Sequence, residues 1–168
     1  WKVYALDKST GKVLWEQTAF EGIPKVKRHP KSSHAASTPA TDGKYLIVNF
    51  GSEGLYAYDL NGKLLWKQDL GVLDAGWFYD VDYQWEYGSS PIIYKNLVIV
   101  GTGVPDRLQY RSDPPGTVQA FDVRTGKRAW VFYTVPQSAT APGADTWGDN
   151  SWRIAGHANV WAPMSLDV

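Results

Sequence analysis

Short runs of alternating apolar and polar residues follow one another along the chain, separated by turns that contain Gly, Pro or Asp. Three of these runs share one pattern: an apolar strand ends at Asp, a turn with Gly follows, and a second strand carries Trp. They cover residues 4–15, 56–66 and 119–130. Alternation with a period of two is typical of half-buried strands, and Gly accepts the positive φ that a tight reversal needs. The pattern predicts three copies of one β-hairpin.

The three hairpins align at four columns, although the second copy has one residue fewer in its turn. The columns are Ala5, Ala57 and Ala120; Asp7, Asp59 and Asp122; Gly11, Gly62 and Gly126; and Trp15, Trp66 and Trp130. An Asp at the end of a strand is expected to accept hydrogen bonds from the amides of the turn. One Trp alone is an ordinary core aromatic, whereas three in one register indicate a shared structural role.

A second set of columns gives the same period from other residues. Its copies are the tripeptides Ser37-Thr38-Pro39, Ser89-Ser90-Pro91 and Trp161-Ala162-Pro163. An apolar strand lies between each of the first two tripeptides and the next hairpin, at residues 45–50 and 97–100. Each full unit therefore has four strands, which is the composition of one propeller blade with its first strand lining the axis.

We therefore predict an all-β fold, a partial β-propeller of four-stranded antiparallel blades with two complete blades and partial blades at both ends. The expected parts are an outer hairpin at 1–18, a blade at 34–70, a blade at 87–135 with an insertion at 105–115, and an inner strand at 156–168. Propellers typically have about four to eight blades, so the missing blades are expected from a longer parent chain or from other copies. The complementary ends predict possible self-association.

Composition and charge exclude several classes of function. Lys and Arg number 17, as do Asp and Glu, so the formal net charge is zero and we expect no nucleic-acid partner. The absence of Cys excludes a disulfide framework and thiolate metal sites. No apolar run approaches the roughly 18 residues of a membrane helix, so we expect no transmembrane segment, and no signal peptide opens this sequence.

The Ala, Asp, Gly and Trp columns resemble the docking motif of propellers of the pyrroloquinoline quinone (PQQ) type, across the whole chain. Residues 1–100 are similar to PQQ-like repeat proteins without catalytic activity. Residues 101–168 resemble the membrane glucose dehydrogenase branch, through PPGTVQAFDVRTGKRAWVFYTVP, DTWGDNSW and ANVWAPMSLD. The resemblance implies one of two functions. The first is a fragment of a PQQ-dependent sugar or alcohol dehydrogenase, inactive as the isolated chain; the second is a non-catalytic periplasmic scaffold or binding module.

The enzyme alternative implies PQQ with Ca²⁺ or Mg²⁺, a sugar or alcohol substrate, and a position in the periplasm or on the periplasmic side of a membrane. In that branch hydride passes from a substrate hydroxyl to PQQ, the metal acts as a Lewis acid, and a carboxylate assists proton removal. The resemblance places Asp167 at the acidic position beside the cofactor. The alternative for Asp167 is a turn residue at a strand end.

Repeat register points to further candidates in the last inner strand. Trp161 stands where the earlier copies have Ser37 and Ser89. A flat aromatic ring suits stacking on a planar cofactor, although packing at the axis is equally consistent. Asn159, two residues earlier, carries an amide that suits a carbonyl or carboxylate.

The remaining charged candidates are two single residues and two segments. His157 and Arg111 are candidates to pair with a cofactor carboxylate, or else are solvated residues of turns and loops. The acidic and aromatic run at 74–87 suits a sugar or a cation, but is better explained as a long loop into the next blade. The basic run at 25–31 is interpreted as a solvated linker between blades.

Overall fold

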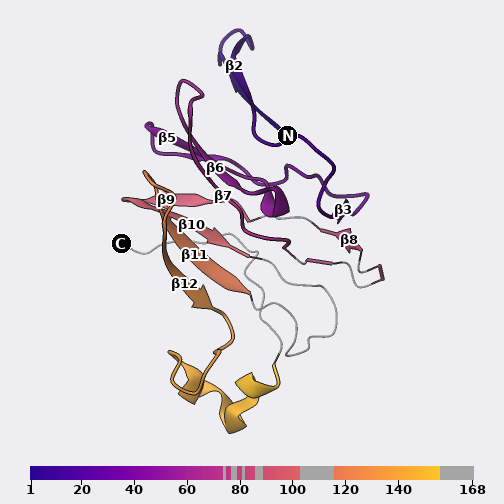
Figure 1. Cartoon of the computed structure of the whole chain (residues 1–168), viewed down its shortest axis with the longest axis vertical. Helices are drawn as coiled ribbons and strands as arrows, with labels where there is room; N and C mark the ends of the chain where they lie inside the picture. Colours follow the sequence, from indigo (N-terminus) through magenta and orange to yellow (C-terminus); the bar gives the residue numbers. More distant parts are fainter. Residues whose placement is uncertain (74, 77–78, 81, 86–88, 103–115, 156–168) are drawn as a thin grey trace.

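The computed structural model describes residues 1–73, 75–76, 79–80, 82–85, 89–102 and 116–155. Strands dominate this part of the chain, in sheets that follow one another as successive layers (Figure 1). The predicted insertion at 105–115, the predicted inner strand at 156–168 and the first residues of the blade at 87–135 lie outside the described residues.

Two four-stranded antiparallel sheets form the centre of the molecule. The first contains β4 (Ala40–Thr41), β5 (Tyr45–Asn49), β6 (Leu55–Asp59) and β7 (Leu64–Gln68). The second contains β9 (Ile92–Tyr94), β10 (Leu97–Gly101), β11 (Thr117–Asp122) and β12 (Arg128–Tyr133). Neighbouring strands in each sheet are consecutive in sequence. The prediction of four-stranded antiparallel blades is thereby confirmed.

A two-stranded antiparallel hairpin of β1 (Lys2–Leu6) and β2 (Val13–Thr18) covers the first sheet. Val3 and Trp15 of this hairpin pack with Val48, Tyr56 and Tyr58 of the sheet. Burial raises the pKa of Tyr58 to about 12. In Figure 1 the hairpin and β12 lie at opposite ends of the stack of layers.

The main core lies between the two four-stranded sheets. Its buried members are Ile47, Leu55, Ala57 and Trp66 from the first sheet, with Val98, Val100, Phe121 and Val123 from the second sheet or directly after it. In β5 and β6 successive residues turn to opposite faces, so each strand supplies apolar side chains to both neighbouring layers. Burial on both faces explains why β5 and β10 consist almost entirely of apolar residues.

The three hairpin turns repeat one another closely. In each, an Asp Oδ1 accepts two backbone N–H groups: Asp7 from Ser9 (3.1 Å) and Thr10 (2.8 Å), Asp59 from Asn61 and Lys63 (both 2.9 Å), and Asp122 from Arg124 (3.1 Å) and Thr125 (2.9 Å). The glycines have positive φ: +70° at Gly11, +84° at Gly62 and +71° at Gly126. These contacts confirm the roles that the columns predicted for Asp and Gly.

Each Trp of the first two hairpins docks on the turn of the next sheet. Trp15 Nε1 donates to Leu60 O over 2.9 Å, and Trp66 Nε1 donates to Val123 O over 2.8 Å. A Cβ added at Gly62 or Gly126 would lie 2.7 Å from Cδ2 of the docked ring. Gly is therefore required there both for the backbone conformation and for the close approach of the ring.

Three short 3₁₀ helices occur in the described part of the chain: η1 (Gly51–Glu53), η2 (Ala144–Thr146) and η3 (Gly148–Arg153). The last two follow β12 and pack Trp152 against Val135 and Ala144 in a small separate core. Within η3, Asp149 and Asn150 have φ of 52° and 54°, which interrupts regular helix. No helix among the described residues is long and apolar enough to cross a membrane.

The structure differs from the sequence interpretation at the segments 25–31 and 74–87. β3 (Lys27–Arg28) pairs in parallel with β8 (Tyr83–Gln84), so each segment contributes a short strand to a two-stranded sheet. The interpretation of 25–31 as a solvated linker agrees with the exposure of Lys27 and Arg28, but it missed the short strand that the segment contributes. Two-residue strands have no detectable periodicity, and their pairing depends on residues far apart in sequence.

Candidate functional site

The order of the strands divides the connections between two opposite edges of the sheets. One, the turn edge, carries the three Asp–Gly turns with the tight turns between β4 and β5 and between β9 and β10. The other, the connection edge, carries η1 and the long segments that link one layer to the next, including 19–39, the described parts of 69–91, and residues 134–155 after β12. Binding residues are commonly placed on loops held by a rigid scaffold. The connection edge is therefore the candidate functional site.

The site residues predicted from sequence fall in two segments that the structure does not describe. Arg111 belongs to 103–115, and His157, Asn159, Trp161 and Asp167 belong to 156–168; all five lie outside the described residues. Their predicted roles stay predictions.

The segments directly before β4 and β9 meet through equivalent residues of the repeat. Ser37 Oγ donates to Ser89 O over 3.0 Å, and the amide of Thr38 donates to Ser90 Oγ over 2.9 Å. Asn49 Nδ2 adds a bond of 3.2 Å to Ser89 O. Small residues at equivalent positions of the repeat therefore contact each other directly between the two sheets.

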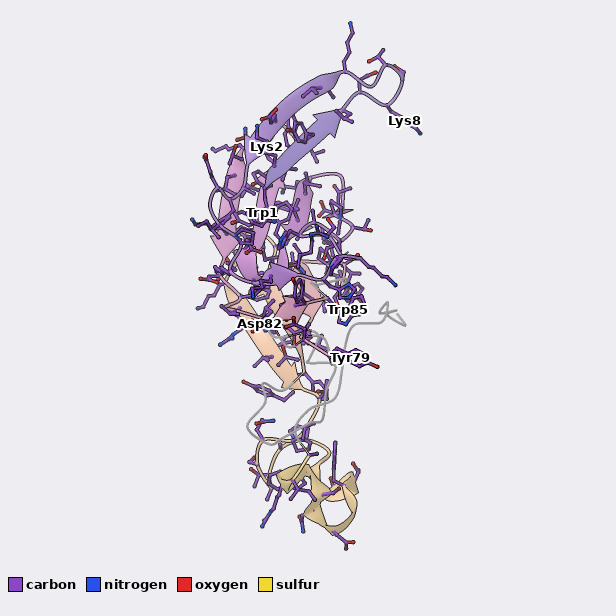
Figure 2. The ribbon with its side chains drawn as sticks, turned by 90° about the vertical axis from the view of Figure 1, so that its right-hand side faces the viewer. Trp1, Lys2, Lys8, Tyr79, Asp82 and Trp85 are labelled. Atoms are coloured by element: carbon purple, nitrogen blue, oxygen red, sulfur yellow. The ribbon has the colours of Figure 1, made fainter. Side chains whose placement is uncertain are left out.

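The parallel pair of β3 and β8 joins two layer-to-layer connections. The His29 amide donates to Gln84 O over 2.9 Å, and Lys27 Nζ lies 3.1 Å from Asp82 Oδ2. The His29 and Trp85 rings stack with centroids 3.9 Å apart. Figure 2 shows Trp85 in the middle of the molecule, well away from Lys8 in the first hairpin turn. Trp85 is 37% exposed, so this edge presents an aromatic surface.

Arg28 organises the turn that follows β3. Its Nη1 donates to three carbonyl oxygens, of His29 (3.2 Å), Pro30 (3.1 Å) and Ser32 (2.6 Å). Ser32 Oγ in turn donates to Trp85 O. These bonds give the guanidinium a structural role in holding the turn against β8.

Glu53 is a buried acid at the connection edge that the sequence reasoning missed. It is only 4% exposed; its Oε1 accepts the Lys25 amide over 2.9 Å, whereas Oε2 has no hydrogen-bond partner within the described ranges. Tyr56 Oη donates to Glu53 O over 2.8 Å, and burial raises the pKa of that phenol. A buried carboxylate oxygen normally requires a partner. The available signal was an acid flanked by Gly51, Ser52 and Gly54 directly after an apolar strand.

The described residues do not by themselves form a site for an anionic cofactor with its metal. Within the described ranges, no group of three His, Asp or Glu side chains is arranged to hold a metal ion. Lys27 pairs with Asp82, Lys25 Nζ lies 3.2 Å from Asp69 Oδ1, and Arg28 is bonded to carbonyls. Two features of these residues stand out: the ring of Trp85, which stacks on His29 and is 37% exposed, and the buried Oε2 of Glu53, which has no hydrogen-bond partner within the described ranges.

Comparison with known proteins covers the whole chain. The family model of the PQQ "Glucose/ethanol/alcohol dehydrogenase, beta-propeller domain" matches residues 1–168. The quinohemoprotein alcohol dehydrogenase ADH IIB of Pseudomonas putida is 32% identical over 99% of this chain and 24% of its own length. The quinoprotein glucose dehydrogenase of Gluconobacter oxydans is 28% identical over 99% of this chain and 22% of its own length. The chain spans about a quarter of the length of the curated relatives it matches.

Solved structures agree on the fold. The quinohemoprotein alcohol dehydrogenase of Comamonas testosteroni superposes with a TM-score of 0.62 at 21% identity, over 99% of this chain and 24% of that one. A europium-containing methanol dehydrogenase gives a TM-score of 0.53, also at 21% identity, over 80% of this chain and 22% of that one. Together with the family match, these likenesses show that the chain belongs to the PQQ β-propeller domain family of glucose, ethanol and alcohol dehydrogenases.

Proposed function

We propose that this chain forms part of the propeller of a PQQ-dependent alcohol or sugar dehydrogenase, and that its connection edge contributes to the cofactor site. The contact between Ser37 and Ser89 carries the proposal, because equivalent inner residues of adjacent sheets touch each other. In the repeat register the next member of that column is Trp161. A small residue is replaced by a large flat ring at the inner end of the blade, which favours a planar ligand there.

The other candidates are proposed to surround that ring. Asn159 belongs to the same predicted strand, two residues before Trp161, and supplies an amide for a carbonyl or carboxylate. His157 and Arg111 supply positive charge or N–H donors for the carboxylates of the cofactor. Bound PQQ supplies a hydride acceptor, polarised by Ca²⁺ or Mg²⁺. Asp167 is proposed to take the proton of the substrate hydroxyl.

Activity is proposed for the complete propeller and not for these residues alone. The chain covers about a quarter of its relatives, so we expect most contacts to PQQ to come from other blades. We therefore expect weak PQQ binding by this chain and no turnover. Alcohols and sugars are the proposed substrates, since the relatives are named for both, and the periplasm is the proposed location.

The test is a titration of the chain with PQQ in the presence of Ca²⁺, in which tryptophan fluorescence reports binding. We expect saturable quenching, with an affinity reduced at least about tenfold in Trp161→Ala, which corresponds to about 1.4 kcal/mol. Trp130→Ala is the matched control, because Trp130 lies on the outer strand β12, and it should bind like the unchanged chain. In the complete propeller, dye-linked oxidation of glucose or ethanol should disappear in Asp167→Asn. Lack of saturable PQQ binding would contradict the proposal and favour the non-catalytic scaffold.

A further inference from the structure

The ring of Trp85 is held at the surface of the connection edge by a second ring beneath it. The Trp85 and His29 rings stack with centroids 3.9 Å apart and planes 24° from parallel. His29 is 5% exposed, and its Nδ1 accepts the Lys31 amide over 3.1 Å, which fixes the imidazole. Because His29 covers one side of the indole, the exposed 37% of Trp85 belongs to the parts that His29 does not cover.

The backbone of Trp85 is fixed from both neighbouring connections. Its amide donates to Ala75 O over 3.1 Å, and its carbonyl oxygen accepts the Ser32 hydroxyl. The preceding residue, Gln84, is 7% exposed and accepts the Ala75 amide at its Oε1. A ring that is already held in place loses little conformational freedom when a ligand stacks on it. Trp85 is therefore a rigid, partly exposed aromatic platform.

A pair of opposite charges lies beside this platform. Lys27 Nζ is 3.1 Å from Asp82 Oδ2, and the two side chains are 64% and 66% exposed. Lys27 pairs with Tyr83 in the register of β3 and β8, and its Nζ lies 5.9 Å from the centre of the Tyr83 ring. Trp85 follows Tyr83 by two residues, about 7 Å along extended chain. Figure 2 shows Asp82 and Trp85 in the same middle part of the molecule.

The chemistry of this surface matches a neutral saccharide. A pyranose ring has apolar C–H groups on its faces, which suit stacking on an indole, and hydroxyl groups around its rim. The Lys27 ammonium supplies hydrogen-bond donors and the Asp82 carboxylate supplies acceptors. Their charges cancel, so the pair has no net attraction for an ion, and an exposed pair is separated at little cost. Hydroxyl groups, which both donate and accept, are the partners that such a pair fits.

We propose that Trp85, with Lys27 and Asp82 beside it, binds one pyranose ring of a neutral saccharide without changing it chemically. The ring stacks on Trp85, and its hydroxyls bond to the charged pair. β3 and β8 belong to connections between layers that the structure describes, so this surface does not arise at either end of the sequence. The inference does not depend on PQQ, and binding is expected in its absence.

The experiment is saturation-transfer difference NMR on the full chain, without PQQ, with methyl β-glucoside as the probe. We expect saturable transfer to the C–H protons of the sugar ring, with a Kd of about 1 to 10 mM, as befits a small ligand on an open surface. Mannitol is the matched ligand control, because it carries similar hydroxyls on an open chain without a rigid ring face. A Trp85 that serves only to cover His29 would not distinguish the two.

Variants separate the platform from the rest of the surface. Trp85→Ala should weaken binding at least about tenfold, because the stacking surface is removed. Asp82→Ala leaves the stack of Trp85 on His29 in place and should weaken binding about threefold through the lost acceptor. It remains informative if Trp85→Ala does not fold, which circular dichroism checks.

Each variant has a matched control elsewhere. Trp130→Ala removes a Trp of similar exposure, 41%, from β12. Glu16→Ala breaks the exposed ion pair of Lys2 with Glu16 in the first hairpin. Both controls should bind the glucoside as the unchanged chain does. Equal transfer to mannitol, no saturation up to about 50 mM, equal losses in the controls, or displacement of the glucoside by a proline-rich peptide that binds more tightly would overturn the proposal.

Discussion

The turn edge of this protein repeats itself, whereas the connection edge does not. All three hairpin turns have the same Asp acceptor and Gly conformation, and two of them receive a Trp ring from the neighbouring layer. At the connection edge one layer has the buried Glu53, another has a parallel pair of short strands, and a third has two 3₁₀ helices. The difference indicates that docking at the turn edge holds adjacent blades together and leaves the connection edge free to diversify for binding.

The largest expected effect comes from removing a docked ring. Trp66→Ala deletes a side chain that is 7% exposed and donates to Val123 O, and we expect it to lower the free energy of unfolding by about 3 to 5 kcal/mol. Trp130→Ala removes the same residue type where it is 41% exposed, and in the monomer it should cost at most about 1 kcal/mol. Urea unfolding of dilute protein measures both. Equal losses would mean that docking adds nothing to stability.

A smaller effect separates backbone strain from docking. Gly62 and Gly43 both have φ of +84°, but only at Gly62 would an added Cβ meet a docked ring, 2.7 Å from Trp15 Cδ2. Gly43→Ala should cost about 1 to 2 kcal/mol from the left-handed conformation alone. Gly62→Ala should cost about 1 to 3 kcal/mol more, because the ring must shift. The excess should vanish when both glycines are tested in a Trp15→Ala background; an excess that persists there would assign the cost to the turn itself.

At the connection edge we expect a weaker effect from the ion pair that joins β3 to β8. Lys27 and Asp82 are 64% and 66% exposed at their side chains, so solvent screens their attraction. A double-mutant cycle with Lys27→Met and Asp82→Asn should give a small coupling energy, within the range typical of exposed ion pairs and falling further in high salt. A coupling well above that range would show that this edge also holds the layers together.

The smallest expected effect is a pH dependence at the first turn. Hydrogen bonds from the Thr10 and Ser9 hydroxyls lower the pKa of Asp7 from 3.8 to about 2. Because the folded pKa is the lower one, the stabilisation is present above about pH 4 and is lost as the pH falls towards 2. Unfolding midpoints measured across that window should change less steeply in Asp7→Asn than in the unchanged chain. Parallel profiles would show that the turn does not contribute to acid stability.

The repeat made most of the fold predictable from sequence. The Asp, Gly and Trp columns predicted the hairpins, and the apolar strands between them predicted two four-stranded antiparallel sheets, as found. The parallel pairing of β3 with β8 was not predictable, because two-residue strands have no period and the two strands lie far apart in sequence. The ion pair beside them, between Lys27 and Asp82, has a sequence separation of 55.

The candidate site was harder to predict from the sequence than the fold was. Trp161 and Asp167 were suggested by register and by resemblance, and they lie outside the described residues. Glu53 was overlooked because it occurs once and matches no column, and its burial depends on how η1 packs under Tyr56 and Lys25. Repetition identifies residues that hold blades together, whereas binding residues depart from the repeat and are best found from burial and unsatisfied polar atoms.

Hydrogen exchange with and without PQQ and Ca²⁺ tests the division between the two edges most directly. Mass spectrometry of peptides measures the exchange of backbone amides and so reports which segments become more protected when PQQ binds. We expect protection in the connection segments at 19–39 and 69–91 and after β12, with no change in the three Asp–Gly turns. Protection confined to those turns, or no protection anywhere at saturating PQQ, would contradict the assignment of the connection edge as the binding site.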